Sequence, residues 1–384
     1  MRVIAWGTYD LSKPRTRILL DALKQAGNDV VECHADVWSD VLDKSQINGT
    51  AAKLKLGWRW ARQYAGLFSR YLTMPRADVV FVGYLGQLDV LLLRPLAALR
   101  GEKVVWDAFI SLHDTVVNDR QMIGSRHLVA RALFAWEWLA CRAADVVLLD
   151  TEAHAQYFRD TFGLNDDRTA AVFVGAEGDA FPAAANRASA DDDDDVIVVL
   201  FYGQFIPLHG IETIIEAARL SDPRRVRWVL IGKGQEVPKI RAMLDEQPVQ
   251  NLEWIPWVEY AELGARIASA DLCLGIFGSS DKAARVIPNK VFQILSVGKA
   301  IITRDSPGIR ELLDDADAGV HLVPPMDPQA LLDAVERHRA LRRGLVEPLH
   351  RAIVERFAAA AIAERLRAIL ERTLTSSALP KAPA

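Results

Sequence analysis

Short apolar segments alternate with helical patterns along almost the whole chain, and this alternation limits the fold more than any other feature of the sequence. In the first half, the expected strands are 2–6, 29–32, 77–82, 103–106, 145–149 and 171–174. In the second half, they are 196–202, 227–231, 251–254, 271–277, 299–303 and 319–323. Apolar strands that alternate with helices are typical of parallel sheets covered by helices on both faces. The sequence therefore predicts an α/β protein with two Rossmann-like domains that face each other across a cleft, which would hold the active site.

The length of the chain and one acidic stretch predict where the domains divide. The 384 residues exceed what one hydrophobic core usually holds. Residues 182–195, PAAANRASADDDDD, contain few large apolar side chains and end in five aspartates, so we expect a linker or exposed loop rather than a metal site. The other expected parts are a first domain at 1–181, a second domain at 196–345, a C-terminal helix at 346–374 that packs back toward the first domain, and a disordered tail at 375–384.

Charge, cysteines and the N-terminus argue against several classes of protein. A net charge of −4 gives no electrostatic case for binding nucleic acid. Cys33, Cys141 and Cys273 lie far apart, which favours a reducing compartment and argues against a structural zinc site. The chain begins with an apolar strand instead of a signal sequence, and no apolar run approaches ~18 residues. We therefore expect a cytoplasmic protein.

Residues 276–302, IFGSSDKAARVIPNKVFQILSVGKAII, carry the strongest indication of a ligand site. Pro288 and Gly298 are typical of the first turn of a short helix and of the residue just past its end. Four polar groups lie before or in the first turn of this helix: Lys282, Arg285, Asn289 and Lys290. Unpaired N–H groups at a helix N-terminus with flanking cations bind phosphate, and Gln293 shares a helix face with Asn289. The alternative interpretation is a loop with solvated charges.

Two glycine-containing turns follow other strands of the same predicted sheet. FYGQFIPLHG contains Gly203, Gln204, His209 and Gly210 before a helix, where glycine permits close approach to an anion. VLIGKGQE contains Gly232, Lys233 and Gly234 after the next strand, where a base or ribose can lie. Together with residues 276–302, these turns suit a nucleoside diphosphate. The sequence has no P-loop motif and no GxGxxG after its first strand, which argues against phosphoryl transfer of the P-loop type and against a dehydrogenase.

Topology alone indicates a second group of site residues, in the first half of the chain. Ligands of doubly wound sheets bind beyond the carboxyl ends of the strands. The residues at these ends are Gly7, Thr8, Gly83, Tyr84, Asp107, Asp150, Thr151 and Gly175.

Three segments of the second half resemble the retaining GT-B glycosyltransferases of family four. FYGQFIPLHGIETIIEAA is similar to the glycine-rich donor loop of that family, IGKGQE to its base-binding turn, and PNKVFQILSVGKAIITRDSPGIREL to the signature along its donor-site helix. In the first half, GTYDLSKPRTRILLDALKQAG, WDAFISLHDT and LLDTEAHAQYF resemble loops of its acceptor-binding domain. The resemblance covers nearly the whole chain. It implies that a sugar is transferred from a nucleotide sugar with retention of configuration, without metal or cofactor and without a protein nucleophile.

The resemblance implies roles for individual residues. The nucleotide sugar would contact Gly203, Gln204, His209, Gly210, Gly232, Lys233, Gly234, Lys282, Arg285, Asn289, Lys290 and Gln293. Catalytic roles would belong to Asp107, His113, Asp114 and Arg285. The acceptor would contact Gly7, Thr8, Arg15, Gly83, Tyr84 and Ser111.

The chain departs from the family pattern at four of these positions. The usual arginine and lysine of the donor loop are Gln204 and His209, and two glutamates of the signature are Arg285 and Gln293. We therefore expect a rearranged donor site in which the cations of residues 276–302 supply the charge. The expected function is a glycosyltransferase that acts on a glycan or lipid-linked acceptor in cell-envelope polysaccharide or glycolipid biosynthesis. The alternatives are a nucleotide-sugar epimerase of the same fold, an inactive glycosyltransferase-like partner subunit, and a dehydrogenase.

Residues 53–76, KLKLGWRWARQYAGLFSRYLTMPR, combine an apolar stripe with basic residues and contain no acid. The stripe consists of Leu54, Trp58, Ala61, Ala65, Phe68 and Leu72. The surrounding cations are Lys53, Lys55, Arg59, Arg62, Arg70 and Arg76. Such a helix suits the surface of an anionic membrane, which would place the protein peripherally on the inner face of the plasma membrane. We weigh this interpretation equally with a domain helix whose stripe belongs to the core.

Overall fold

The computed structural model describes residues 1–37, 50–183 and 196–375. For residues 50–57 and 59, it describes the backbone but not the side chains. The expected linker and tail lie almost entirely outside these residues. The chain forms two compact units, of which the first contains Met1–His113, Leu128–Phe173 and Ala359–Ala384. The second contains Asp114–His127 and Val174–Ala358. The units thus differ from the predicted ranges 1–181 and 196–345, chiefly because a segment from the first half of the sequence folds with the second unit.

The first unit is built on a parallel sheet in the order β2-β1-β3-β4-β5-β6. Its strands are β1 (Arg2–Gly7), β2 (Asp29–His34), β3 (Val79–Val82), β4 (Lys103–Phe109), β5 (Val146–Leu149) and β6 (Thr169–Ala171). β3 and β5 consist entirely of buried apolar residues, as parallel strands covered on both faces require. The strand expected at 171–174 lies two residues earlier, in β6.

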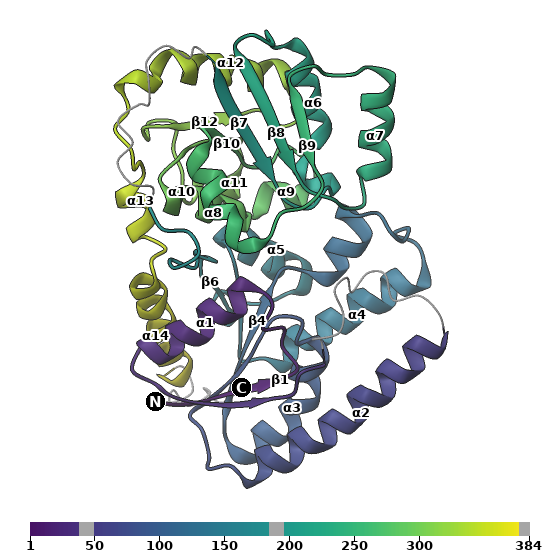
Figure 1. The fold of residues 1–384 in the computed structure, drawn as a ribbon. Coiled ribbons are helices and arrows are strands. Elements are labelled where there is room, and N and C mark those ends of the chain that lie inside the picture. Colours follow the sequence, from purple (N-terminus) through teal and green to yellow (C-terminus); the bar gives the residue numbers. More distant parts are fainter. Residues whose placement is uncertain (38–49, 184–195, 376–384) are drawn as a thin grey trace. The chain divides into compact units, whose positions relative to one another are not determined.

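Helices cover both faces of this first sheet. One core is shared with α2 (Thr50–Thr73), α3 (Gln87–Arg100), α4 (Leu128–Ala143) and α5 (Glu152–Phe162). The opposite core is shared with α1 (Pro14–Gln25) and α14 (Ala359–Thr375), which lie side by side in Figure 1. The single helix expected at 346–374 is in fact two, because α13 (Arg351–Glu355) precedes α14 and belongs to the second unit.

The second unit is built on a parallel sheet in the order β12-β11-β10-β7-β8-β9. Its strands are β7 (Ile197–Tyr202), β8 (Val226–Ile231), β9 (Leu252–Ile255), β10 (Leu272–Leu274), β11 (Ala300–Arg304) and β12 (Val320–Val323). Three consecutive strands run outward to one side of the sheet and the next three to the other, which is the Rossmann order. The direction of winding reverses between β7 and β10.

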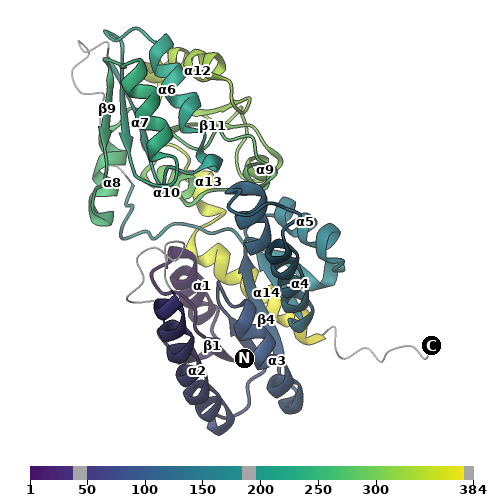
Figure 2. The same ribbon diagram turned by 90° about the vertical axis from the view of Figure 1, so that its right-hand side faces the viewer.

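The helices of the second unit complete this fold. α6 (Ile211–Leu220) and α12 (Pro328–Leu341) contact each other and share a core with the sheet (Figure 2), and Ile240 of α7 (Val237–Glu246) joins this core. α10 (Asn289–Val297) contacts β11, α8 (Tyr260–Ser269) and α13. The shorter helices are α9 (Asp281–Arg285) and α11 (Pro307–Arg310). The predicted α/β class and both parallel sheets are confirmed.

The helix expected after Pro288 is α10. Pro288 is its N-cap residue, and Gly298, with φ +83°, ends it in the left-handed conformation. The amide of Gly298 donates to the carbonyl oxygens of Ile294 and Leu295 and so satisfies the last turn. Pro288 and Gly298 thus set the two ends of α10, and Asn289 and Lys290 are the first two residues of its first turn.

Candidate functional site

The carboxyl edge of the second sheet, between β7 and β10, holds most of the residues expected to bind the donor. Ligands of doubly wound sheets bind where the winding reverses. Gly203 follows β7 with φ +142°, and a Cβ atom there would lie 3.0 Å from Nζ of Lys290 and 3.2 Å from Cε1 of His209. A Cβ on Gly232, after β8, would lie 1.9 Å from the carbonyl oxygen of Gly203. The backbone at both positions therefore requires glycine, as the sequence predicts.

Lys290 is a buried cation in the first turn of α10. Its side chain is 5% exposed, and Nζ has no hydrogen-bond partner among the residues that the structure describes. Nζ lies 3.6 Å from the ring centroid of Phe201, so a cation–π contact is its principal interaction. Burial lowers the pKa of Lys290 well below its ordinary value, because the charged form is poorly solvated. An anion at this position would remove that penalty.

His209 does not replace the expected cation beside Gly203. Its Nδ1 donates to the carbonyl oxygen of Gln204, which leaves Nε2 as an acceptor in a neutral ring. Burial and the charge of Lys290 lower the pKa of His209 well below its ordinary value. The amide of Gly210 donates to the carbonyl oxygen of Pro207 and is therefore also occupied. Gln204 itself is exposed. The expectation that His209 and the Gly210 amide assist at the phosphates does not fit this geometry.

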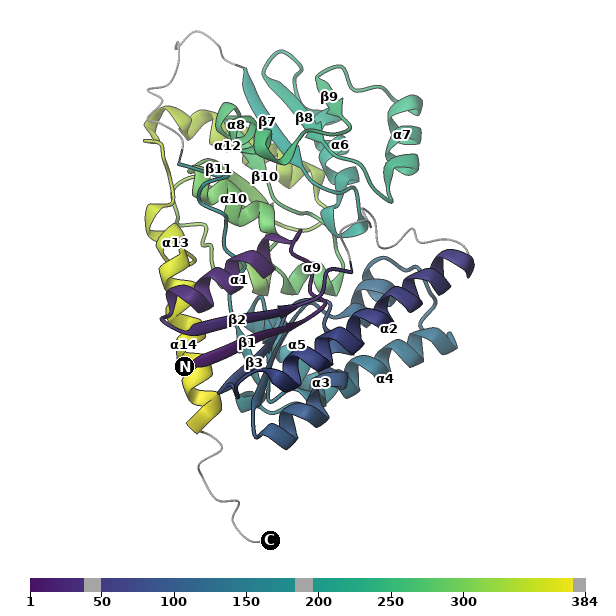
Figure 3. The same cartoon turned by 60° about the horizontal axis from the view of Figure 1, so that its bottom comes forward.

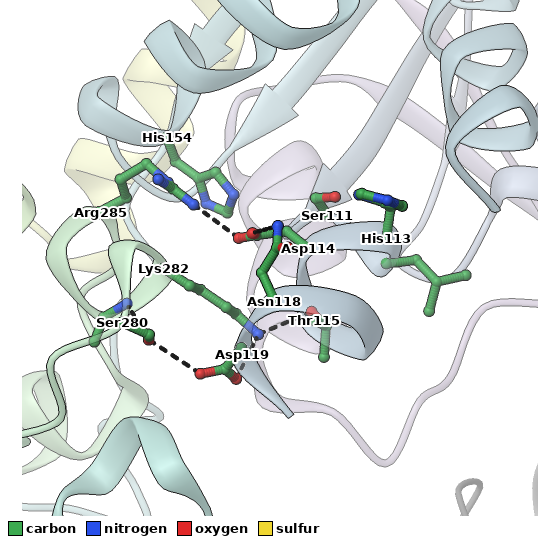
Figure 4. A network of polar contacts seen from close by, with 12 residues as sticks. Ser111, His113, Asp114, Thr115, Asn118, Asp119, His154, Ser280, Lys282 and Arg285 are labelled. Atoms are coloured by element: carbon green, nitrogen blue, oxygen red, sulfur yellow. Dashed lines mark hydrogen bonds and ion pairs between the residues drawn. The ribbon is translucent and has the colours of Figure 1, made fainter. Parts of the chain in front are cut away.

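Two of the expected phosphate cations are paired with carboxylates of the same unit (Figure 4). Nη2 of Arg285 lies 2.8 Å from Oδ2 of Asp114, whose side chain is almost completely buried. Nζ of Lys282 lies 3.5 Å from Oδ2 of Asp119 and donates to Oγ1 of Thr115 at 2.8 Å. Asp114 to Asp119 form a π-helix, η2, so that α9 and η2 are joined by two ion pairs. The geometry therefore favours a positioning role for Arg285 and Lys282, as well as for Asp114, over direct contact with substrate.

Gln293 lies within a chain of hydroxyl and carboxyl groups on the side of α10 that faces α8. Oε1 of Gln293 accepts from the hydroxyl of Tyr202 at 2.9 Å. Its Nε2 lies 3.5 Å from the hydroxyl of Tyr260, which donates to Glu177 at 2.8 Å. Asn289, four residues before Gln293, is half-buried. Sequence reasoning missed Tyr202, although it directly precedes Gly203, because the sequence does not reveal that its hydroxyl reaches α10. It missed Tyr260 because this residue lies outside the glycine-containing turns.

The turn after β8 is open to solvent. Lys233 and Gly234 are exposed, and Nζ of Lys233 lies 4.5 Å from the ring centroid of Trp257. Trp257, which sequence reasoning did not select, is 60% exposed. An exposed indole beside a glycine turn offers a flat apolar face to a nucleobase.

In the first unit, the expected acceptor residues lie at the ends of β1 and β3, where the strand order of this sheet reverses. Gly7 is the last residue of β1 and Thr8 follows it, and Gly83 and Tyr84 follow β3. The amide of Thr8 donates to Oδ2 of Asp89 at 2.8 Å, and the hydroxyl of Tyr64 donates to Oδ1 of Asp89 at 2.5 Å. Asp89 is completely buried, and burial raises its pKa to about 6. Asp89 thus fixes the turn after β1.

Arg15 and Asp107 form an ion pair in the interior of the first unit. Nη2 of Arg15 lies 2.7 Å from Oδ1 of Asp107, and both side chains are at most 1% exposed. Arg15 also donates to the carbonyl oxygens of Val172 and Leu149 at 2.8 and 3.2 Å. These contacts tie α1 to the ends of β4, β5 and β6. A catalytic role for Asp107 and an acceptor-binding role for Arg15 do not fit this burial.

The loop after β4 is held by Glu137 of α4, which sequence reasoning missed. Oε2 of Glu137 accepts from the hydroxyl of Ser111 at 2.5 Å and from the amide of His113 at 3.1 Å. Burial raises the pKa of Glu137. The expected acceptor residue Ser111 is therefore engaged within the unit. Glu137 and Asp89 share a signal that could have revealed them, since each is a single acid within an apolar helical stretch.

His154 and Asp150 form a second buried pair, at the end of β5. Nδ1 of His154 lies 2.8 Å from Oδ1 of Asp150, and Nε2 of His154 is buried without a hydrogen-bond partner among the described residues. The hydroxyl of Thr151 caps α5 by accepting from the amide of His154. His154 belongs to the segment LLDTEAHAQYF but had not been selected. Within the described ranges, no three His, Cys, Asp or Glu side chains are grouped as a metal ion would require.

Comparisons with known proteins agree with this arrangement. Residues 196–339 match the family model of the glycosyl transferases group 1. WcaI of Escherichia coli (strain K12), by name a colanic acid biosynthesis glycosyl transferase, is 27% identical over 162 residues. These residues are 41% of this chain and 38% of that protein, so the match covers less than half of either.

Solved structures extend the likeness in fold over the whole chain. HepE of Anabaena in complex with UDP and glucose superposes with a TM-score of 0.65 at 15% identity, over 99% of this chain and 100% of that chain. The catalytic domain of starch synthase IV from Arabidopsis thaliana, bound to ADP and acarbose, superposes with a TM-score of 0.69 at 12% identity, over 97% and 99%. The protein therefore has the GT-B fold.

Proposed function

We propose that this protein is a retaining glycosyltransferase that moves a sugar from a nucleoside-diphosphate donor to a glycan or lipid-linked acceptor of the cell envelope. One observation carries the proposal: Lys290 is a buried cation without a hydrogen-bond partner among the described residues, and its Nζ lies against the backbone of Gly203, where a larger residue would crowd it. A diphosphate would pair with this ammonium group and with the N-terminal amides of α10. The colanic acid function in the name of WcaI supports an acceptor of the cell envelope.

The donor would bind along the carboxyl edge of the second sheet. Its diphosphate would lie at Lys290 and Asn289, and its ribose would reach Gln293, which is four residues further along α10. The base would lie over the turn at Gly232 to Gly234, against the exposed ring of Trp257. UDP in the HepE structure and ADP in the starch synthase structure are ligands of the size that this edge would take.

The resemblance implies a mechanism in which the substrate supplies the base. An oxygen of the departing diphosphate accepts the proton of the acceptor hydroxyl, and the new glycosidic bond forms on the face that the diphosphate leaves. Neither a protein nucleophile nor a metal enters this route. The protein contributes by positioning both substrates and by stabilising the charge that develops on the diphosphate. We assign this stabilisation to Lys290.

The acceptor would bind to the first unit, at the turns after β1, β3 and β4. Tyr84 and His113 are the side chains on these turns that we assign to it, whereas Arg15, Asp107 and Glu137 support the turns. The hydroxyl of Thr8 is buried and donates to Oδ1 of Asp89 at 3.1 Å, so Thr8 does not fit the expected contact with the acceptor. Asp89 has the same supporting role for Thr8.

We also propose that α2 contacts an anionic membrane. Tyr64, Leu67 and Tyr71 form the side of α2 that packs in the core. The expected stripe lies mostly elsewhere: Trp58 is 74% and Leu72 56% exposed, and Ala61 and Ala65 are exposed. The interpretation that this stripe belongs to the core is therefore wrong for these four residues, whereas Phe68 is partly buried against the core. Leu54 lies among the residues whose side chains are not described.

Helices α3 and α4 lie on the same side of the first sheet as α2 (Figure 3). Exposed apolar residues of α3 and α4 include Leu99, Leu128 and Leu139, while the acids Asp89 and Glu137 of these helices are buried. The sequence of α2 contains no acid, so exposed arginines of this face meet no opposing charge within their own helix. Basic and apolar side chains on one face suit an anionic lipid surface, where a lipid-linked acceptor would be found. No helix among the described residues is long and apolar enough to cross a membrane.

Binding of nucleoside diphosphates tests the proposed function first. Thermal unfolding would be followed with UDP, GDP, ADP or dTDP in the presence of EDTA, with NAD as the control. A ligand at ~100 times its Kd stabilises the folded protein by about 2.7 kcal/mol, which raises Tm by several degrees. We expect a rise with at least one diphosphate and none with NAD. No rise with any diphosphate would favour the inactive partner subunit, and a rise with NAD alone would favour the dehydrogenase.

Measuring turnover of the nucleotide sugar distinguishes the glycosyltransferase from the remaining alternative, an epimerase. With the donor sugar attached to the base that binds, an epimerase would change the sugar configuration without any second substrate. A transferase would release the diphosphate only slowly until an acceptor is added, and the anomeric configuration of the product, read by NMR, would test retention.

A further inference from the structure

The segment Asp114–His127 brings residues from the first half of the sequence to the second unit. Its π-helix η2 is fixed at both ends: Asp114 pairs with Arg285 at 2.8 Å, and Asp119 accepts from the hydroxyl of Ser280 at 3.1 Å while pairing with Lys282 (Figure 4). Asp114 and Asp119 are each 2% exposed. These contacts hold η2 rigidly against α9, so the residue that follows η2 has a defined position.

That residue is Arg120, and its backbone is fixed from two sides. Its amide donates to the carbonyl oxygen of Thr115 at 2.9 Å. Its carbonyl oxygen accepts from Nε2 of Gln235 at 3.2 Å. Gln235 belongs to the turn after β8, next to Gly234. Arg120 is therefore attached to the same turn that we assign to the donor base.

The guanidinium group of Arg120 differs from that of Arg285 in forming no ion pair with any acid in the described part of the chain. Its Nε is buried, and among the described residues it has no hydrogen-bond partner. The charge of Arg120 helps to lower the pKa of both His209 and Lys282, although burial is the larger cause in each case. Lys290 acts on His209 in the same direction. Arg120, Lys282 and Lys290 thus concentrate positive charge around a neutral His209.

Among the residues that the structure describes, only part of this positive charge is matched by a carboxylate. Lys282 is paired with Asp119, but no carboxylate is described beside Lys290 or beside the guanidinium of Arg120. Like charges in a poorly solvated site repel each other, and a bound dianion would offset this repulsion because it attracts each of the cations. A diphosphate is the anion that the proposed function brings to this edge.

We propose that Arg120 binds the diphosphate of the donor together with Lys290, in place of the arginine that the resemblance leads one to expect at Gln204. The inference rests on the proposed function, because it names a further residue of the same donor site. The inference also explains the ion pairs of Asp114 and Asp119: they hold Arg120 in position, so that it can replace the arginine that is missing at Gln204.

The test compares a diphosphate with its monophosphate. Isothermal titration calorimetry would measure UDP and UMP, or the pair of the base selected by the thermal screen, with the whole chain. We expect Arg120→Ala to weaken diphosphate binding roughly 10- to 100-fold, as loss of a charge-assisted hydrogen bond does, and to weaken monophosphate binding much less. Arg120→Lys should restore part of the affinity. Arg126→Ala, which removes an exposed arginine from the same segment, should leave both affinities unchanged.

The outcomes separate this inference from the proposed function. If the wild-type protein binds no nucleoside diphosphate, both are overturned. If it binds and Arg120→Ala binds equally well, or if diphosphate and monophosphate lose affinity by the same factor, Arg120 does not contact the diphosphate. Equal thermal stability of the Arg120→Ala and Arg126→Ala variants would show that the segment is still folded, so that a selective loss of diphosphate binding supports direct contact.

Discussion

The side chain of Lys290 lowers the stability of the folded protein and at the same time provides the charge that we assign to diphosphate binding. Its ammonium group is 5% exposed and has no hydrogen-bond partner among the described residues. A buried polar group without a partner costs about 1–3 kcal/mol of folding free energy. Part of this cost is offset by the contact with the ring of Phe201. When a residue lowers stability but is needed by a binding site, its replacement is expected to raise stability and to reduce activity.

We therefore expect Lys290→Met to raise the Tm of the protein without ligand and to weaken diphosphate binding at least roughly tenfold. Methionine keeps the apolar volume and removes the charge that burial disfavours. Scanning calorimetry measures the first effect and titration calorimetry the second. Lys239→Met is the matched control, because Lys239 is exposed and pairs with Glu212 on the surface. A Lys290→Met protein that binds diphosphate like the wild type would exclude this ammonium from the phosphate site.

Single residues could be predicted where their neighbours in sequence determine their role. Gly203 and Lys290 follow from a turn after a strand and from the first turn of a helix. The role of Arg285 could not be predicted, because its partner Asp114 lies 171 positions away along the chain. Arg15 was misassigned for the same reason, since its pairing with Asp107 depends on how α1 lies over the ends of three strands.

At the scale of elements, α2 shows why periodicity alone could not choose a face. Trp60, Tyr64, Leu67 and Tyr71 repeat at intervals of four and three residues, and Trp58, Ala61, Ala65 and Leu72 at intervals of three, four and seven. Both stripes fit a helix, and only the position of the sheet decides which is buried. The structure buries the aromatic stripe, because its larger side chains fill the space over β1 and β3. The other stripe is left exposed beside cations.

We expect this exposed face to determine binding to anionic vesicles. Trp58→Ser combined with Leu72→Ser should reduce sedimentation with phosphatidylglycerol vesicles by roughly tenfold, because less apolar surface can enter the lipid. Arg62→Glu should reduce it further and make it less sensitive to salt. Leu220→Ser is the matched control, since Leu220 of the second unit is 56% exposed, as Leu72 is. Unchanged sedimentation of the Trp58 and Leu72 variant, or equal binding of the wild type to neutral vesicles, would contradict the proposed contact.

At the scale of the whole molecule, the two parallel sheets could be predicted, but not the transfer of a segment from the first half of the sequence to the second unit. The alternation of strands and helices leaves few arrangements other than two parallel sheets. The transfer of Asp114–His127 to the second unit depends on side-chain pairs that are distant in sequence. The return of α14 to the first unit, in contrast, agrees with the C-terminal helix that the sequence predicts to pack back toward the first domain. α14 returns because its apolar stripe, including Leu366 and Leu370, fills the core that it shares with α1. Segment 114–127 has too little apolar surface to fold alone and is held by ion pairs.

Two histidines of the second unit, His338, which is buried, and His350, which is half-buried, should make its stability fall in mild acid. His338, in α12, and His350, the N-cap residue of α13, each have a pKa lowered to about 4, mainly by burial. An unfolded chain binds these protons near pH 6.5, so it holds more protons than the folded chain between about pH 6.5 and 4. Stability is therefore complete above about pH 6.5 and is lost as the pH falls toward 4.

The expected loss by pH 5 is on the order of 2 kcal/mol for each of the two histidines. Urea unfolding at pH 7.5 and pH 5.0, followed by the fluorescence of Trp228 and its neighbours, measures it. His350→Asn should diminish the difference between the two pH values, even if it lowers stability at both by removing the hydrogen bond to the carbonyl oxygen of Lys299. Asparagine also tolerates the left-handed conformation of residue 350, where φ is +69°. His127→Asn, at an exposed position, should leave the difference unchanged. If His350→Asn and His338→Gln both keep the full difference of the wild type, the acid sensitivity arises from other groups.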